Sequence, residues 1–322
     1  MTARPATDQG LTLRTFGLTD IGLKRKANED VAVVRDDLGL YAVLDGAGGH
    51  DAGDVAAHAA ARTLVKQIAE SADAAAAKPE FDPFGVANDL RRLAAAVHRA
   101  NRDVVEIARA AMSRRGMGTT VVALLFTQRA SLVHVVHAGD SRAYRWRAGH
   151  LEQLTVDHSM INDIMEQRPD LDDDVIKSLP QHAVTRALGM EEKVRVPLAS
   201  YEVVDGDRFL LCSDGLTGVV NAEALADALA RRDPPPETVV ALIDLAKAGG
   251  APDNVSVLVV DCHGPRRAAV PVYDRASVDT QRDVRSSEPE LLLLGIEEIP
   301  LDELRSRDVD ELSEVLARII RR

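Results

Sequence analysis

The 322-residue chain has only two cysteines, Cys212 and Cys262, and each lies inside an apolar stretch. No Cys-X-X-Cys element and no paired Cys/His spacing occurs in the sequence. These absences exclude a disulfide scaffold and a zinc site with the usual ligand spacing. We therefore predict two reduced, buried thiols.

The sequence also lacks long apolar runs, and none approaches the roughly 20 residues that a membrane helix requires. Its first ten residues have no basic region followed by an apolar core, so they do not read as a signal peptide. These features predict a soluble, cytoplasmic protein that does not bind a membrane.

Basic residues are too few for a general nucleic-acid binder. The chain has 39 Lys and Arg against 51 Asp and Glu, a net charge of −12. Such a surface repels phosphate backbones and anionic lipid.

Aromatic residues are also scarce, at 3% against 46% hydrophobic residues, so the core must be built from alanine, valine and leucine.

Three regions of the chain differ in amino-acid composition and in the pattern of their apolar residues. Residues 11–262 contain short β-rich runs, at 40–44, 120–126, 132–136, 209–212 and 255–260, with helical patterns at 52–69 and 86–111. The alanine-rich segment 71–78 between those two patterns is predicted to be a loop. Because the helices come in pairs and do not alternate one for one with strands, the pattern favours an α+β fold. Residues 263–300 have the composition of a flexible linker.

Residues 301–322 are predicted to form an amphipathic helix, because the apolar residues from Val309 to Ile320 are spaced by three and four. This helix would dock on the main domain, on a second copy or on a partner. The alternative is a short helix that hangs free on the linker.

Aspartates recur where apolar strands begin or end. Asp45, Asp140 and Asp214 each follow a strand, and Asp253 precedes one. For each taken singly, ordinary turn chemistry is an equally good explanation. If the four ends converge, however, the carboxylates repel one another and a multivalent cation relieves the repulsion. Oxygen donors without Cys or His favour Mg²⁺ or Mn²⁺ over zinc.

A second charged cluster, residues 25–30, precedes the strand at 31–34. Arg25 offers a planar fork for phosphate oxygens, while Glu29 and Asp30 could extend a metal site. The alternative is a charged loop without function. The glycine-rich stretch after Asp45 would let backbone approach a ligand closely, and the Gly46 carbonyl could bind metal. It is neither a P-loop nor a dinucleotide fingerprint.

Taken in order, these pieces resemble the bacterial branch of the metal-dependent protein phosphatases, the PPM or type 2C family. The matching segments are 25–30, 43–50, 116–120, 138–144, 154–159, 185–189, 213–216 and 253–256. They cover about 250 residues and leave the C-terminal tail out. The resemblance implies a four-layer α-β-β-α sandwich with two central antiparallel sheets.

The resemblance also implies seven metal-binding residues: Glu29, Asp30, Asp45, Gly46, Asp140, Asp214 and Asp253. In the family pattern, Asp45 bridges two ions, and Asp214 and Asp253 complete the first. The Gly46 carbonyl binds the second ion, which Glu29 and Asp30 hold largely through water. Asp140, with Asp214, can hold a third, weaker ion.

By the same resemblance, Arg25 binds the substrate phosphate. Water between two divalent ions is acidified and attacks phosphorus in line. Arg25 and the ions balance charge on the phosphoryl oxygens. Some family members place a histidine soon after the Asp-Gly pair, where this chain has Ala47, and His50 comes three residues later, so the general acid stays unassigned.

The resulting prediction is a phosphoserine/phosphothreonine protein phosphatase that reverses bacterial Ser/Thr kinase signalling. Its partners would be phosphorylated proteins, namely such kinases and their substrates. A phosphorylated anti-sigma antagonist would be an equally compatible substrate. The alternative function is a catalytically weak, metal-binding signalling scaffold, which loss of a metal aspartate would have favoured; none is lost.

Overall fold

The computed structural model describes residues 11–48, 52–83, 85–127, 131–172, 175–176, 179–180 and 183–264. His50, nearly all of the predicted linker and the predicted helix at 301–322 lie outside these residues. The domain boundaries drawn from composition therefore stay predictions.

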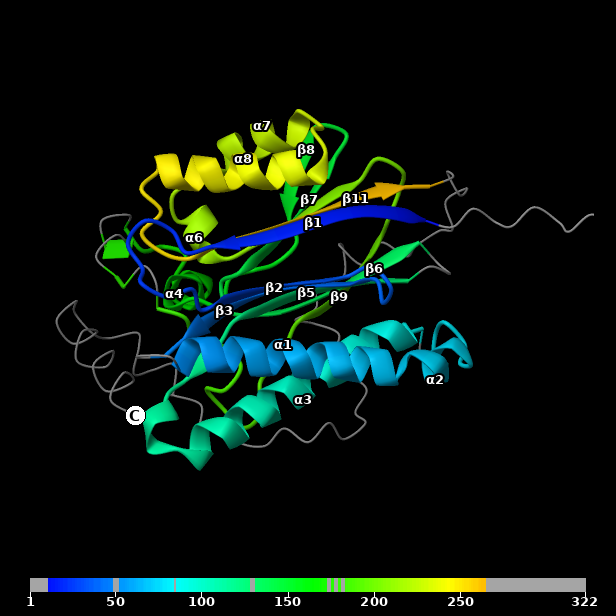
Figure 1. Ribbon diagram of the computed structural model, residues 1–322, viewed down its shortest axis with the longest axis horizontal. Coiled ribbons are helices and arrows are strands. Elements are labelled where there is room, and N and C mark those ends of the chain that lie inside the picture. The colour runs from blue at the N-terminus through cyan, green and yellow to red at the C-terminus, as the bar shows by residue number, and fades with distance from the viewer. Residues whose placement is uncertain are drawn as a thin grey trace, which may run out of the picture. The chain divides into compact units, whose positions relative to one another are not determined.

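Two antiparallel sheets form the middle of the main region (Figure 1). The first has the strand order β1-β11-β10-β7-β8, with these strands at Thr12–Asp20, Val255–His263, Arg208–Cys212, Arg142–Arg147 and His150–Gln153. The second has the order β2-β3-β5-β6-β9, at Asp30–Arg35, Leu40–Ala47, Val121–Thr127, Leu132–Ala138 and Leu198–Glu202. A two-residue strand, β4 at Gly118–Thr119, pairs with the end of β3.

Helices cover the outer face of each sheet (Figure 1). The pair α1 (Ala52–Glu70) and α3 (Asn88–Ala110) packs on the second sheet, and the pair α7 (Ala222–Ala230) and α8 (Pro235–Ala248) packs on the first. The predicted α+β class and four-layer sandwich are confirmed. The shorter helices are α2 (Ala72–Ala76), α4 (Met160–Gln167), α6 (Asp214–Thr217) and a 3₁₀ turn at Met112–Arg114.

The loop predicted at 71–78 is wrong in part, because α2 occupies five of its residues. Alanine has the highest helix propensity, and no proline falls inside the run. None of the α2 side chains is buried, so α2 forms by local preference and contributes little to the core.

The core has three apolar clusters, one under each helix pair and one between the sheets. Three of the few aromatic rings gather in the middle cluster. Tyr41 meets Phe126 edge-to-face at 5.7 Å between ring centroids, and Phe126 meets Phe209 of the other sheet in the same way at 5.5 Å. Such contacts add to the apolar burial that holds the sheets together. Small side chains such as Ala56, Ala57 and Ala60 bring α1 close to its sheet.

Helix ends carry recognisable caps. The Asn221 side chain accepts a hydrogen bond from the Ala224 amide at the start of α7, and Ser159 caps α4 in the same manner. Pro235 opens α8, where no amide donor is needed.

Within the described part of the chain, no helix is both long and apolar enough to cross a bilayer.

Both cysteines are buried and unpaired, as predicted. Burial raises the pKa of the Cys212 thiol to about 12. We expect iodoacetamide at pH 8 to leave Cys212 unmodified in the native protein and to alkylate it after denaturation in guanidinium, because only the thiolate reacts. Intact-mass spectrometry measures both states. Rapid alkylation of the native protein at Cys212, located by peptide mapping, would contradict the structure.

Candidate metal centre

Two of the predicted aspartates face each other across neighbouring strands. Asp30 begins β2 and Asp45 lies near the end of β3, and the antiparallel register makes them direct cross-strand partners. Partners in such a pair lie about 5 Å apart, so two like charges here repel. Without a bound cation, the repulsion between these two carboxylates therefore destabilises the folded protein.

The other sheet brings two more carboxylates to the same end. Asp214 is the first residue of α6, two positions after β10 ends, and Asp253 comes two positions before β11 begins. Ser213, beside Asp214, connects the sheets: its hydroxyl donates to Asp30 Oδ2 at 2.8 Å and accepts from the Ser256 amide at 2.9 Å. Ser213 is fully buried, and it fixes the position of Asp30 relative to the β10–β11 end.

Asp140 follows β6 and is tied to Asp45 through hydroxyl groups. The Thr120 hydroxyl accepts from the Asp45 amide at 3.0 Å and lies 2.7 Å from the Ser141 hydroxyl. The Thr120 amide in turn donates to the Asp45 carbonyl at 2.8 Å. This network holds the ends of β3, β5 and β6 together.

These carboxylates lie close enough to shift one another's pKa. Burial raises the pKa of Asp45 well above its usual value, and the charges of the other four predicted aspartates raise it further. Burial raises the pKa of Asp30 to about 6, against the lowering effect of its hydroxyl partners, with Asp214 and Asp253 adding to the rise. Burial, with Asp214, raises the pKa of Asp140 to about 6.

Gly46 must be glycine because backbone crowds it. A Cβ there would lie 2.3 Å from the Gly53 carbonyl oxygen and 2.7 Å from that of Glu29. The Gly46 amide also donates to the Glu29 carbonyl at 3.2 Å. The first turn of α1, the end of β3 and Glu29 thus meet closely, which places Glu29 beside the acidic cluster. The pKa of Glu29 is raised, mainly by burial. The charge of Arg25 acts to lower this pKa, and the charge of Asp253 acts to raise it.

Asn254 organises the loop that contains Arg25. Its side-chain oxygen accepts from the Glu29 amide at 2.9 Å, and its amide nitrogen donates to the carbonyls of Ile21 and Ala27 at 3.0 and 2.9 Å. Asn254 belongs to the segment 253–256 that resembles the family, but the sequence does not indicate its role. Neither Ser213 nor Thr120 had a predicted role, because only the folded register shows what their hydroxyls reach.

Arg25 is bound to one of the predicted metal ligands. Its Nη2 lies 2.7 Å from Asp253 Oδ2, and the Arg25 side chain is 48% exposed. The hydrogen bond to Asp253 raises the pKa of the guanidinium, and the charges of Glu29 and Asp45 act in the same direction. The structure thus brings together all eight predicted site residues at one end of the sandwich.

The donor set fits a hard divalent cation. In the cluster all side-chain donors are carboxylate oxygens, and Asp30 Oδ1 is buried with no hydrogen-bond partner among the described residues. Among the residues that the structure describes, no three Asp, Glu, His or Cys side chains already lie close enough to enclose an ion. The cluster is therefore a set of mutually repelling carboxylates without a closed coordination shell, and a cation would offset that repulsion.

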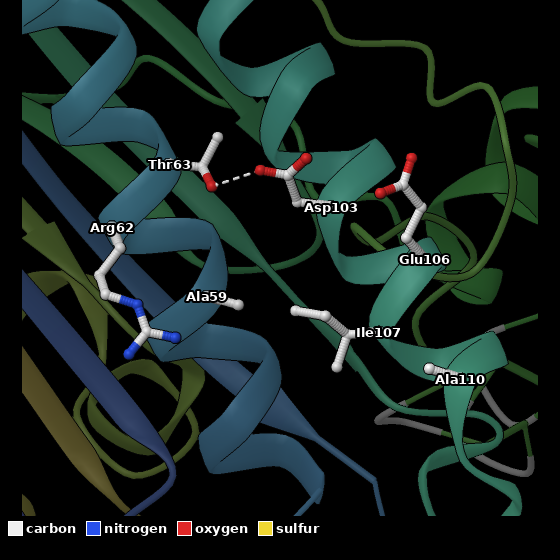
Figure 2. Close-up of a pocket in the computed structure, with 7 residues that line it drawn as sticks. All are labelled: Ala59, Arg62, Thr63, Asp103, Glu106, Ile107 and Ala110. Atoms are coloured by element: carbon white, nitrogen blue, oxygen red, sulfur yellow. Dashed lines mark hydrogen bonds between the residues drawn. The ribbon is translucent and has the colours of Figure 1, made fainter.

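A pocket of about 370 Å³ lies elsewhere, between the middle of α1 and the C-terminal half of α3 (Figure 2). Figure 2 shows Thr63 of α1 and Asp103 of α3 joined across it by a hydrogen bond of 2.7 Å. The remaining lining residues are Ala59, Arg62, Glu106, Ile107 and Ala110. The pocket contains none of the predicted site residues.

Comparisons with known proteins agree with this geometry. The family model described as "Protein phosphatase 2C" matches residues 26–247. The chain is 34% identical over 246 residues to the Serine/threonine phosphatase stp of Listeria monocytogenes, covering 76% of this chain and 93% of that protein. It is 36% identical over 252 residues to the Serine/threonine protein phosphatase PstP of Mycobacterium tuberculosis, covering 78% of this chain and 45% of that protein.

Solved structures are similar over about four fifths of this chain. The Mycobacterium tuberculosis serine/threonine phosphatase PstP/Ppp gives a TM-score of 0.67 at 34% identity, covering 78% of this chain and 99% of that chain. The catalytic domain of PstP in complex with two manganese ions gives 0.66 at 34% identity, covering 79% and 99%.

Proposed function

This chain belongs to the protein phosphatase 2C family, and from that premise we propose that its acidic cluster is the metal centre of a serine/threonine protein phosphatase. The enzyme hydrolyses phosphoserine and phosphothreonine in proteins and depends on metal ions. The proposal for the site rests above all on the convergence of five aspartates from both sheets beside Arg25.

We assign two Mn²⁺ or Mg²⁺ ions to the centre. Asp45 would be shared by both ions, Asp214 and Asp253 would hold the first, and the Gly46 carbonyl would hold the second. Glu29 and Asp30 would complete the second site, and Asp140 with Asp214 would hold a third ion. When bound, the ions supply an acidified water as nucleophile and positive charge for the phosphoryl oxygens.

The chain's own residues position the substrate and the ligands. Arg25 turns its planar fork toward the phosphoryl oxygens and offsets their charge as it builds up in the transition state. Asn254 holds the Arg25 loop, Ser213 holds Asp30, and Thr120 holds the backbone of Asp45. Cys212 is buried in the core with a raised pKa and plays no part as a nucleophile.

We further propose that the enzyme acts in the cytoplasm in signal transduction, where it reverses the action of bacterial Ser/Thr kinases on their substrates. The named phosphatase relatives and the absence of a membrane-spanning helix among the described residues support this assignment.

The test is hydrolysis of a phosphothreonine peptide by the purified protein with Mn²⁺, with Mg²⁺ and with EDTA. We expect turnover with metal and none with EDTA. Asp214→Asn should lower turnover roughly 100-fold or more, because it weakens the ion that activates water. Asp244→Asn, an exposed aspartate on α8, is the matched control and should leave turnover unchanged.

A folded protein that binds Mn²⁺ but hydrolyses no phosphopeptide with either metal would support the scaffold alternative. Full activity of Asp214→Asn would remove this residue from the centre while leaving the family assignment intact.

A further inference from the structure

Arg186 is a half-buried cation without an acidic partner in the described part of the chain. Its Nη1 lies 2.8 Å from Nε2 of His158, which is its one side-chain neighbour at hydrogen-bonding distance among those residues. Among the residues that the structure describes, every other buried or half-buried arginine pairs with a carboxylate, as Arg142 does with Asp157 and Arg147 with Asp207. Whether the contact between Arg186 and His158 is a hydrogen bond depends on which ring nitrogen of His158 carries a proton.

The proton count on the His158 ring shows that this contact joins two donors. The backbone amide of Gly139 donates to His158 Nδ1 at 3.1 Å, and an amide N–H has no means of accepting. Nδ1 is therefore unprotonated, and in a neutral ring the proton is on Nε2. The ring is neutral because burial, followed by the charge of Arg186, lowers the pKa of His158 to about 3. Nε2–H thus faces a guanidinium N–H.

The His158 side of this contact is fixed. The His158 amide donates to the Gly139 carbonyl at 3.0 Å, while the ring stacks on His137 with centroids 4.6 Å apart and planes 4° from parallel. His137 is held in turn by the Val156 carbonyl, 2.8 Å from its Nε2. Arg186, by contrast, is a long side chain with several rotatable bonds. Its guanidinium is the partner that can turn to a true acceptor.

The chain around Arg186 lies beside the proposed metal centre. Two residues after it, Leu188 exchanges backbone hydrogen bonds with Thr119 at 2.8 and 3.0 Å, and Thr119 is the cross-strand partner of Gly46. On the other side, the His158 ring contacts Gly139, the residue before Asp140. The segment that contains Arg186 therefore lies between the strand ends that bear Gly46 and Asp140, whereas Arg25 comes from the loop before β2.

From this placement we infer that Arg186 is a second oxyanion-binding residue of the substrate site and that it takes phosphoryl oxygens together with Arg25. The inference rests on the proposed function for the site's location, but it concerns the binding of phosphate itself. A phosphoryl oxygen is an acceptor only, so it would replace the donor–donor contact with a charge-assisted hydrogen bond.

The test measures the affinity of inorganic phosphate for the Mn²⁺-loaded protein by calorimetry, and KM and kcat for a phosphothreonine peptide. We expect Arg186→Gln to weaken phosphate binding about tenfold or more and to raise KM more than it lowers kcat, because one charge-assisted bond is lost. Arg186→Lys keeps the charge without the fork and should fall in between. Arg195→Gln, which removes an exposed arginine from the following segment, is the matched control and should change neither quantity.

Thermal unfolding separates binding from a structural role. Removing a donor that faces another donor should leave the unfolding midpoint of Arg186→Gln equal to or above that of the wild type. A lowered midpoint with unchanged phosphate affinity would overturn the inference, as would a wild-type protein that binds no phosphate. If Arg186→Gln does not fold, Arg186→Lys decides: phosphate affinity equal to that of the wild type would overturn the inference.

The two proposals fail in different ways. If the Mn²⁺-loaded wild type binds phosphate but hydrolyses no peptide, the proposed function fails and the comparison of phosphate affinities still tests Arg186. If hydrolysis is normal and Arg186→Gln binds phosphate as the wild type does, only the inference about Arg186 fails.

Discussion

Asp45→Asn is expected to lower phosphopeptide hydrolysis roughly a thousandfold and, in EDTA, to raise the protein's resistance to heat. The activity falls because the proposed centre loses the carboxylate that both ions share, and with it most of the activation of water. The stability rises because Asp45 is surrounded by like charges: burial and then Asp30, Asp214, Asp140 and Asp253 all raise its pKa. Amide oxygen and nitrogen replace the charge with little change in shape.

Turnover and the unfolding midpoint, both measured at pH 8, check the two halves of this prediction. Asp244→Asn removes an exposed carboxylate from α8 and should change neither. If Asp45→Asn lost activity but also melted lower in EDTA, Asp45 would have a structural role that its surroundings do not show. If it melted higher and kept activity, the cluster would be acidic without being catalytic.

Asp261→Ala is expected to destabilise the protein by about 3–5 kcal/mol, because it leaves a buried arginine without its counter-charge. Arg208 is 1% exposed and binds Asp261 through two hydrogen bonds, Nε to Oδ1 at 2.5 Å and Nη2 to Oδ2 at 2.7 Å. It also donates to the Asp233 carbonyl at 2.7 Å and to the Thr238 hydroxyl at 3.2 Å. One guanidinium thus connects β10, β11 and the start of α8.

Urea unfolding of the variant against the wild type measures this difference. The control is Asp37→Ala, which breaks the exposed pair of Arg35 and Asp37 and should cost less than about 1 kcal/mol. Replacing both partners, as in Arg208→Met with Asp261→Leu, should recover much of the lost stability, because no buried charge is then left unpaired. A loss below about 1 kcal/mol for Asp261→Ala would show that water reaches Arg208.

The sequence pattern predicts most of the strands that are buried on both faces, and of the edge strands it predicts β2, at 31–34, but not β1, β8 or β9. The runs at 40–44, 120–126 and 255–260 correspond to β3, β5 and β11, because continuous apolar character marks a strand covered by helices on one side and a sheet on the other. The edge strands β1 and β9 were not identified, since half-exposed strands mix polar and apolar residues.

The candidate site divides in a similar way. Aspartates at strand ends are visible in sequence because each sits at a change from apolar to polar residues. The residues that position them are not, because Ser213, Thr120 and Asn254 act through hydrogen bonds to partners 75 or more positions away. The donor–donor contact between His158 and Arg186 likewise joins residues that are 28 positions apart in the sequence.

The pairing of Arg25 with Asp253 makes the arginine an internal counter-ion. On the proposed assignment, a divalent cation would compete with Arg25 for the charge of Asp253, so loading the site favours the exchange of one cation for another. The displaced guanidinium is then available to phosphate. Linkage requires the effect to be mutual. If bound metal increases the affinity for phosphate by some factor, bound phosphate increases the affinity for metal by the same factor. The protein therefore takes up its two ligands as a cooperative pair.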